Sequence, residues 1–299
     1  MNLFLTVVWK FSPTLVHLGS FELRYYGLMW ALGFAVSMLL FVRFIRREGY
    51  PEKMFDSIFW YAVLSCIIGS RLGHCLFYEP ETYLKHPLEI LKIWEGGLAS
   101  HGAAIGLLVG LWLFSRKNRM PYLWSLDRIM IAVTISGALV RLGNLFNSEI
   151  YGVQTDLPWG FIFVRTGETV PKHPTQIYEA LCYIVGFAIL LWFYYKRDMA
   201  RRRPGFMFGL GLVIVFLSRF LIEFIKMPQE SFEQGMFLDM GQLLSLPFII
   251  AGIAFMALAF RKPALQPEPI ALILERREAE MRRERKVHEK REKKASGKR

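Results

Sequence analysis

The sequence predicts an all-α polytopic membrane protein with about seven transmembrane helices, its N-terminus outside and its C-terminus in the cytoplasm. Of its 299 residues, 54% are hydrophobic and 15% aromatic, which makes a water-soluble α/β enzyme a poor explanation. An apolar stretch of about 17 to 25 residues can cross a bilayer as a helix. The candidate stretches are 27–42, 57–77, 97–115, 126–147, 176–195, 205–225 and 241–260.

The loops between these stretches predict the orientation, because lysine and arginine accumulate in short cytoplasmic loops. The loops after the first, third and fifth stretches are strongly basic, and the last of them contains Lys196, Arg197, Arg201, Arg202 and Arg203. The alternate loops hold fewer basic residues and also acidic ones. Residues 1–26 lack the pattern of a cleavable signal peptide, so we expect the first stretch to act as the insertion signal.

We expect two parts, a membrane domain at 1–262 and a charged cytoplasmic tail at 263–299. From Glu275 onward the tail has twelve basic and six acidic residues, which accounts for much of the net charge of +12. Such a tail could bind nucleic acid, but its place after a membrane span favours contact with anionic headgroups. Three cysteines fall in the predicted spans without disulfide or metal spacing, and we interpret them as buried apolar residues.

The fourth span ends in polar residues where lipid-compatible ones are expected. Helical spacing places Gly137, Arg141, Asn144 and Ser148 on one face, with Glu149 near its edge. A charge at the centre of a transmembrane helix costs about 2.5–3.5 kcal/mol on insertion scales, so this face is expected to point into a bundle. The alternative is that Arg141 extends toward water while the asparagines cap the helix.

A histidine stands near the start of the third span, in LASHGAAIG. His101 is followed by small residues, which allow helices to approach closely. The unperturbed pKa of histidine, about 6.5, makes it suitable to accept a proton near neutral pH. Hydrogen-bonded packing is an equally good interpretation of a lone histidine.

Two more polar groups occur toward the same predicted outer surface. Arg219 and Glu223 are four residues apart in the sixth span and could pair with each other, while Lys226 on the same rim suggests anion binding. At the start of the fifth span Pro174 suits a first helical turn. We therefore expect His173 and Thr175 to be capping and entry residues of the helix, and Gln176 and Glu179 to project from that turn. Together these groups predict a polar cavity near the outer leaflet that accepts an anionic headgroup.

Seven segments carry a resemblance to a known family. They are RYYGLMW (24–30), GSRLGHCLFY (69–78), HGAAIG (101–106), RLGNLFNSEIYG (141–152), HPTQIYE (173–179), RFLIEF (219–224) and MGQLLSLP (240–247). In this order they resemble the bacterial prolipoprotein diacylglyceryl transferases. The chain departs from the usual pattern at Ala103, Val140, Leu145-Phe146 and Val215, which affects packing and substrate preference more than the reaction. The tail lies outside the resemblance.

The resemblance implies an enzyme that moves the diacylglyceryl group of phosphatidylglycerol to the lipobox cysteine of a prolipoprotein. A thioether forms and glycerol 1-phosphate leaves, which is the first step of lipoprotein maturation. The implied partners are phosphatidylglycerol, prolipoprotein signal peptides and the lipid bilayer, without nucleic acid. The implied place is the bacterial cytoplasmic (inner) membrane, with the active site toward the outer leaflet. No metal or other cofactor is expected.

The resemblance also implies residue roles. The catalytic residues would be His101, Arg141 and Arg219, because arginine can grip the phosphate leaving group with two donors and histidine can take the thiol proton. Substrate contacts would come from Tyr26, Arg141, Asn144, Glu149, Gly152, Arg219 and Glu223, and supporting contacts from His173, Gln176 and Glu179.

Two other functions compete with this interpretation. A carrier for an anionic solute or lipid could use Arg141 and Arg219 as a clamp, but carriers favour internal repeats, and none is found in this sequence. An intramembrane serine protease would need a G-x-S-G stretch, which this chain lacks.

Overall fold

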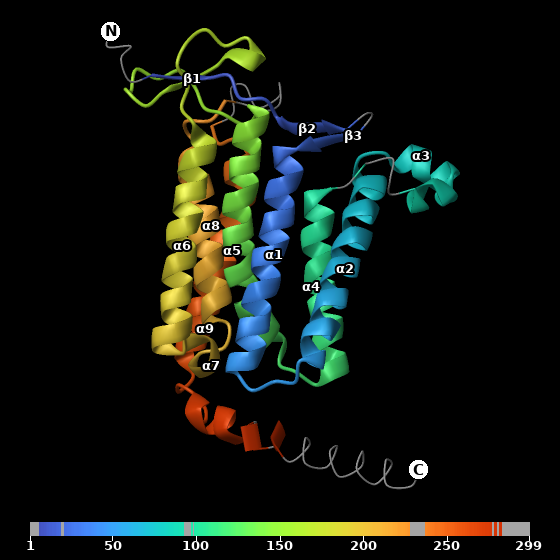
Figure 1. The fold of residues 1–299 in the computed structure, drawn as a ribbon, viewed down its shortest axis with the longest axis vertical. Helices are drawn as coiled ribbons and strands as arrows, with labels where there is room; N and C mark the ends of the chain where they lie inside the picture. The colour runs from blue at the N-terminus through green and yellow to red at the C-terminus, as the bar shows by residue number, and fades with distance from the viewer. Residues whose placement is uncertain are drawn as a thin grey trace, which may run out of the picture. The chain divides into compact units, whose positions relative to one another are not determined.

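The computed structural model describes residues 6–18, 21–92, 97, 99–227, 237–276, 278–279 and 281–282, and most of these residues are helical (Figure 1). The long helices are α1 (Tyr25–Arg47), α2 (Lys53–Phe77), α4 (Ser100–Asn118), α5 (Tyr122–Asn147), α6 (Thr175–Arg197), α8 (Phe206–Glu223) and α9 (Met240–Arg261). The short helices are α3 (Pro80–Lys85), α7 (Met199–Arg202), η2 (Pro87–Leu91) and η4 (Val164–Thr166).

Among the described residues, six helices are long and apolar enough to cross a membrane, namely α1, α2, α5, α6, α8 and α9. A mostly helical, multi-pass membrane protein is therefore confirmed. The third predicted span forms α4, which has 19 residues and is not among these six helices. Serine, histidine and glycine in this helix, together with Arg116 and Lys117 in its last turn, dilute its hydropathy.

The chain forms two compact units. Unit 1 comprises Met1–Leu40 and Leu123–Leu265, and unit 2 comprises Phe41–Tyr122 and Gln266–Arg299. The boundary that we predict at residue 262, between membrane domain and tail, stays a prediction.

In unit 1, α8 packs against both α6 and α9. Glycines allow the approach of α8 to α9, because a Cβ atom on Gly252 would lie only 2.7 Å from the carbonyl oxygen of Gly209. Gly137 of α5 faces α6, since its Cβ would meet the ring of Tyr183 at 3.2 Å. The face of α5 that carries Arg141 therefore points into the helix bundle, as the sequence predicts.

In unit 2, α2 and α4 pack together along a seam of glycines. Gly69 and Gly73 of α2 face Gly102 and Gly106 of α4, and a Cβ at any of the four would collide with the opposite backbone. Small residues at four-residue spacing let two membrane helices approach closely. This seam explains why HGAAIG follows the histidine with small residues.

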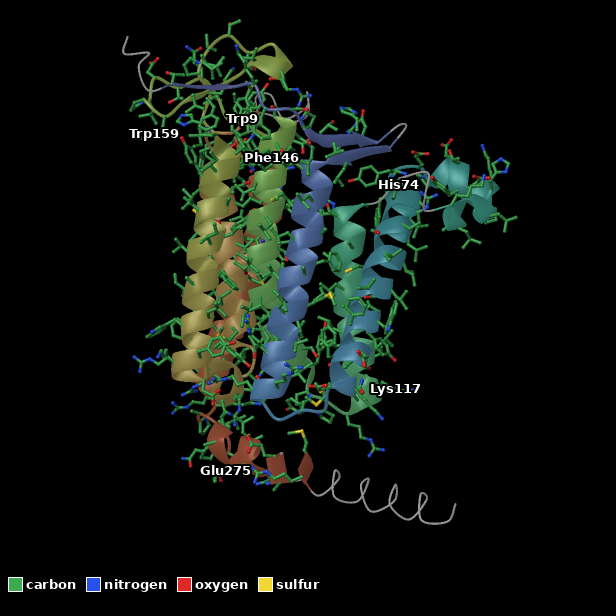
Figure 2. The ribbon with its side chains drawn as sticks, in the orientation of Figure 1. Trp9, His74, Lys117, Phe146, Trp159 and Glu275 are labelled. Carbon is green, nitrogen blue, oxygen red and sulfur yellow. The ribbon has the colours of Figure 1, made fainter. Side chains whose placement is uncertain are left out.

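Short strands, which the sequence analysis does not predict, lie at one end of unit 1. Strand β1 (Val7–Trp9) pairs in parallel with β4 (Phe161–Phe163), while β2 (Thr14–Leu18) and β3 (Phe21–Arg24) form an antiparallel hairpin. The indole nitrogen of Trp9 donates a hydrogen bond to the carbonyl oxygen of Leu145 at 3.1 Å. Trp9 and Phe146 lie close together in Figure 2, with ring centroids 6.2 Å apart. These contacts join the N-terminal strands to the end of α5.

Candidate active site

An ion pair between α5 and α6 forms the centre of the candidate site. The Nε atom of Arg141 lies 2.5 Å from Oε2 of Glu179, whose side chain is fully buried, whereas that of Arg141 is 16% exposed. Its Nη1 donates to Oδ1 of Asn144 at 3.4 Å. The alternative that Arg141 extends toward water is therefore wrong, because a carboxylate inside the bundle holds it.

Lys226 joins the same charge cluster from the segment after α8. Its Nζ donates to Oε1 of Glu179 at 2.8 Å and to Oε2 of Glu223 at 3.0 Å, and only 2% of its side chain is exposed. The interpretation of Lys226 as an anion-binding residue on the rim is therefore wrong. Buried cations need such partners, since an unpaired buried charge is very costly.

Glu149 turns back toward the end of α5. Its Oε1 accepts hydrogen bonds from Nδ2 of Asn144 at 2.7 Å and from Nδ2 of Asn147 at 3.2 Å. Helix α5 ends at Asn147, and both neighbours of Glu149 adopt the left-handed region, Ser148 with φ 57° and Ile150 with φ 59°. Ser148 therefore does not continue the polar face of the helix. Left-handed backbone at two non-glycine residues is unusual, and such strain is concentrated at functional sites.

The first turn of α6 holds this strained turn in place. Nε2 of Gln176 donates to the carbonyl oxygen of Glu149 at 2.6 Å, and Oγ1 of Thr175 donates to that of Ile150 at 2.8 Å. Pro174 is the N-cap of α6, and no side chain caps the helix. The expected capping by His173 and Thr175 is therefore wrong, since the Thr175 hydroxyl binds the preceding loop instead, whereas Thr175 does stand at the entry of α6 as its first residue.

Backbone hydrogen bonds connect the loop after α5 to the ends of two other helices. The Gly152 nitrogen donates to the carbonyl oxygen of His173 at 2.8 Å, and Gly152 forms an antiparallel bridge with Lys226. A Cβ at Gly152 would lie 2.7 Å from that of His173. Only glycine fits this close approach, which fixes Lys226 beside the loop.

Arg219 points toward the cluster without pairing with Glu223 in the described part of the chain. Its Nε is buried, with no hydrogen-bond partner among the described residues. It acts electrostatically on Tyr183, which also hydrogen-bonds to Arg141. The alternative that Arg219 and Glu223 pair with each other is therefore wrong, because Glu223 pairs with Lys226.

Two small contacts complete the surroundings in unit 1. A Cβ at Gly241, at the start of α9, would overlap the carboxylate of Glu223, so this glycine makes room for the ion pair. Tyr26 lies against α5, since a Cβ at Gly143 would be 2.9 Å from its ring. The structure thus brings together in one unit every predicted site residue except His101.

Two ionisable groups near the cluster lie outside the membrane-spanning helices. Burial lowers the pKa of His173, whose Nδ1 is 3.3 Å from the hydroxyl oxygen of Tyr178. The pKa of Tyr151 is raised, first by burial, and its hydroxyl donates to Glu168 at 3.0 Å. Both residues therefore favour their neutral forms.

His101 belongs to unit 2, where it occupies the first turn of α4 with an exposed side chain. The neighbouring Gly102 is buried in the seam with α2. Within the described ranges, no group of three or more His, Cys, Asp or Glu residues has an arrangement suited to a metal ion.

Sequence reasoning missed Gly241 and Tyr183 as members of the site. Gly241 stands in the matched segment MGQLLSLP, but nothing in the sequence connects it with Glu223. Tyr183 is four residues after Glu179, so helical spacing from that carboxylate could have indicated it.

A multi-pass helical protein with a buried cluster of arginine, lysine and glutamate belongs to the class of membrane proteins that handle a charged group inside the bilayer. The sequence matches the prolipoprotein diacylglyceryl transferase family over residues 13–258. This chain belongs to that family, and it is a transferase.

Relatives in several bacteria support this assignment. The phosphatidylglycerol–prolipoprotein diacylglyceryl transferase of Tolumonas auensis is 44% identical over 257 residues, which cover 86% of this chain and 98% of the relative. The protein of the same name from Porphyromonas gingivalis is 46% identical over 274 residues, covering 87% and 97%. That of Bacteroides fragilis is 41% identical over 277 residues, covering 89% and 99%.

Proposed function

We propose that this chain transfers the diacylglyceryl group of phosphatidylglycerol to the lipobox cysteine thiol of a prolipoprotein. The bond between the glyceryl carbon and the phosphate oxygen breaks, a carbon–sulfur bond forms, and the thiol loses its proton. Glycerol 1-phosphate leaves. The names of the relatives support these substrates.

The buried Nε of Arg219 is the observation that carries the proposal. Arg141 is committed to Glu179, while Lys226 is shared between Glu179 and Glu223. The Nε of Arg219 is therefore a buried donor that no described residue uses, and it can bind a phosphate oxygen. Charge grows on the leaving phosphate in the transition state, so a positioned guanidinium favours that state over bound substrate.

The remaining predicted residues act around this contact. Arg141 is the second phosphate ligand, while Asn144, Glu149, Gln176 and Glu179 orient it through the hydrogen bonds described above. Tyr26, Gly152 and Glu223 shape the headgroup site, and His173 supports the start of α6. His101 accepts the thiol proton as a general base.

The membrane topology belongs to the same proposal. Seven helices cross the cytoplasmic (inner) membrane, with α4 as the seventh, the N-terminus outside and the C-terminus inside. The cluster at the ends of α5, α6 and α8 then lies toward the outer leaflet, where secreted prolipoproteins emerge. The basic loops after the first, third and fifth predicted stretches support this orientation.

Replacement of Arg219 tests the phosphate contact. We expect Arg219→Ala to reduce transfer of labelled diacylglyceryl from phosphatidylglycerol to a lipobox peptide by about 10²–10³-fold, as for loss of a transition-state donor. Arg219→Lys should restore little, because lysine cannot form the two-pronged contact. Arg165→Ala is the matched control, since Arg165 is exposed in the loop between α5 and α6. Equal activity of the Arg219→Ala and Arg165→Ala proteins would refute the proposed contact.

Replacement of His101 tests the base. A general base contributes roughly 10²–10⁴-fold, so His101→Gln should lose that much transfer while the protein keeps its thermal stability. A peptide in which serine replaces the lipobox cysteine gives the background. Activity of His101→Gln within about threefold of wild type would leave His101 as a packing residue and the arginine site unaffected.

A further inference from the structure

A second cationic feature lies at the opposite ends of the unit 1 helices, outside the candidate active site. A cavity of about 380 Å³ is lined by residues of α6, α7 and α9, including Trp192, Phe193, Arg197, Arg202, Arg203 and Phe260. Figure 1 shows α7 beside the ends of α6 and α9. This volume is within the usual range of small-ligand sites, about 300–1,000 Å³.

Three aromatic residues, Trp192, Phe193 and Phe260, line this cavity. Phe193 and Phe260 both pack edge to face against the buried ring of Phe206 in α8, with centroids 5.2 Å and 5.5 Å away. Trp192 remains 46% exposed and Phe260 54% exposed. Aromatic residues at the ends of membrane helices are typical of the lipid–water interface. These rings can therefore take the apolar part of an amphiphile.

The arginines of the cavity differ in what they bind. Nη1 of Arg203 donates to the carbonyl oxygens of Ala259 at 3.0 Å and Lys262 at 2.5 Å, so Arg203 anchors the end of α9. Arg197 and Arg202 are exposed, and within the described ranges neither has a carboxylate partner. The nearby Asp198 is 3.3 Å from Arg201. Two guanidinium groups thus border the cavity without a carboxylate partner in the part of the chain that the structure describes.

We propose that this cavity binds the phosphodiester headgroup of one anionic glycerophospholipid from the cytoplasmic leaflet. Arg197 and Arg202 bind the phosphate through charge-assisted hydrogen bonds. The guanidinium of Arg197, 5.0 Å from the centre of the Trp192 ring, is already oriented by cation–π contact. The lipid's glycerol and upper acyl carbons lie along Trp192 and Phe260. The aromatic rings beside the arginines favour a lipid over a soluble phosphate, because a soluble phosphate has no apolar part that could contact the exposed rings.

Binding of a non-substrate lipid tests the proposal without reference to transfer. The full-length protein in neutral detergent is titrated with phosphatidylserine and, as the zwitterionic comparator without net charge, phosphatidylcholine, and bound lipid is counted by native mass spectrometry. We expect Arg197→Gln/Arg202→Gln to bind phosphatidylserine about tenfold more weakly than wild type, the scale of one lost charge-assisted hydrogen bond. Phosphatidylcholine has the same phosphodiester, but its choline cation offsets that charge, so it should bind wild type more weakly and lose less binding in the double variant.

The matched control is Arg116→Gln/Lys117→Gln at the end of α4. Arg116 also lies over a tryptophan ring, that of Trp112 at 5.6 Å, and this double variant removes the same charge from a helix end on the same predicted side of the membrane. It should bind phosphatidylserine within about twofold of wild type, because the cavity is intact in this variant. Any nonspecific electrostatic attraction to the anionic lipid is reduced equally in both double variants. Trp192→Leu keeps the charges and should weaken binding to an intermediate extent.

Three outcomes would overturn the proposal. They are equal weakening in both double variants, equal binding of the two lipids by wild type, and full displacement of the lipid by inorganic phosphate. Thermal unfolding without lipid shows whether each variant is folded, and Trp192→Leu replaces the double variant if that one is not. Transfer activity of Arg197→Gln/Arg202→Gln should stay near wild type in vesicles saturated with phosphatidylglycerol, so failure of the proposed transferase function is recognised separately.

Discussion

The two ends of unit 1 use cationic side chains in opposite ways. At the end near β1 and β4, Arg141 and Lys226 are buried and share the carboxylate of Glu179. At the other end, Arg203 binds backbone carbonyl oxygens, while Arg197 lies over an aromatic ring and is exposed. The residue types are nearly the same, but their partners differ.

This difference shows what each end requires. Buried ions must be held by precise partners, because removing one partner leaves the other uncompensated. Exposed arginines keep their hydration, so they stay available to a ligand and contribute little to stability. The first end is therefore a site whose residues depend on one another for their positions. At the second end, the exposed arginines can change position to bind a ligand.

The largest effect is expected from the carboxylate shared by two cations. Glu179→Gln should lower the free energy of unfolding by about 3–5 kcal/mol, since Arg141 and Lys226 lose their common counterion. Asp198→Asn is the matched variant at the other end, where asparagine tolerates the left-handed backbone of φ 50°. It should change stability by no more than about 1 kcal/mol. Thermal and denaturant unfolding in detergent measure the stability of both variants. Comparable losses of stability would show that the two ends do not differ in how they hold their charges.

A smaller effect is expected from the close approach at Gly152. Gly152→Ala should destabilise the protein by about 1–3 kcal/mol, because the new methyl group collides with His173 and Thr175. Transfer should fall as well, since the bridge to Lys226 opens. Gly27→Ala, whose Cβ meets no described heavy atom within 4 Å, should be neutral or slightly stabilising. If Gly152→Ala proved as stable as Gly27→Ala, the loop would be less tightly held than its contacts indicate.

The opposite end has one buried carboxylate of its own. Asp127 is fully buried, and its side chain accepts hydrogen bonds from the backbone nitrogens of Gly205 at 2.8 Å and Phe208 at 2.9 Å, at the start of α8. Asp127→Asn keeps one hydrogen-bond acceptor, so the free energy of unfolding should fall by about 0.5–2 kcal/mol, as for the loss of a helix N-cap. Hydrogen exchange at the first turn of α8 should rise in this variant and stay unchanged in Glu179→Gln.

The smallest effect concerns pH. Because burial lowers the pKa of His173, its contribution to stability is complete above the unfolded value of about 6.5 and is lost as pH falls through the folded value. His173→Gln should therefore flatten the decline of the melting temperature between about pH 7 and pH 5. If the melting temperature fell identically in wild type and variant, other ionisable groups would be responsible for the pH dependence.

The helices could be predicted from the sequence because each buried or lipid-facing stretch is continuous and apolar. Every one of the seven predicted stretches lies in a helix, but the ends differ by several residues. For example, α2 begins at Lys53 rather than near residue 57, since the polar Lys53 and Asp56 in its first turn carry no hydropathy signal. The strand pair β1–β4 was missed because its strands have three residues each and lie far apart in sequence.

The sequence indicated which polar side chains lie together better than it indicated how they pair, and their roles stay a prediction. Spacing on one helix indicated Arg141, Asn144 and Glu149, and these residues are in contact. Which cation meets which carboxylate depends on the rotation of α6 and α8 and on the loop after α5. Helical spacing allowed Arg219 to pair with Glu223, whereas the bridge at Gly152 brings Lys226 to that carboxylate.

The contact of Trp9 with Leu145 can form only late during synthesis of the chain. The two residues are 136 positions apart, and their hydrogen bond joins the first strand to the end of α5. At a synthesis rate of about 5–20 residues per second, roughly 7–27 s pass between synthesis of the tryptophan and synthesis of its acceptor. During that interval the N-terminal segment needs protection from other partners, and a fusion or tag placed before it would be present throughout the wait.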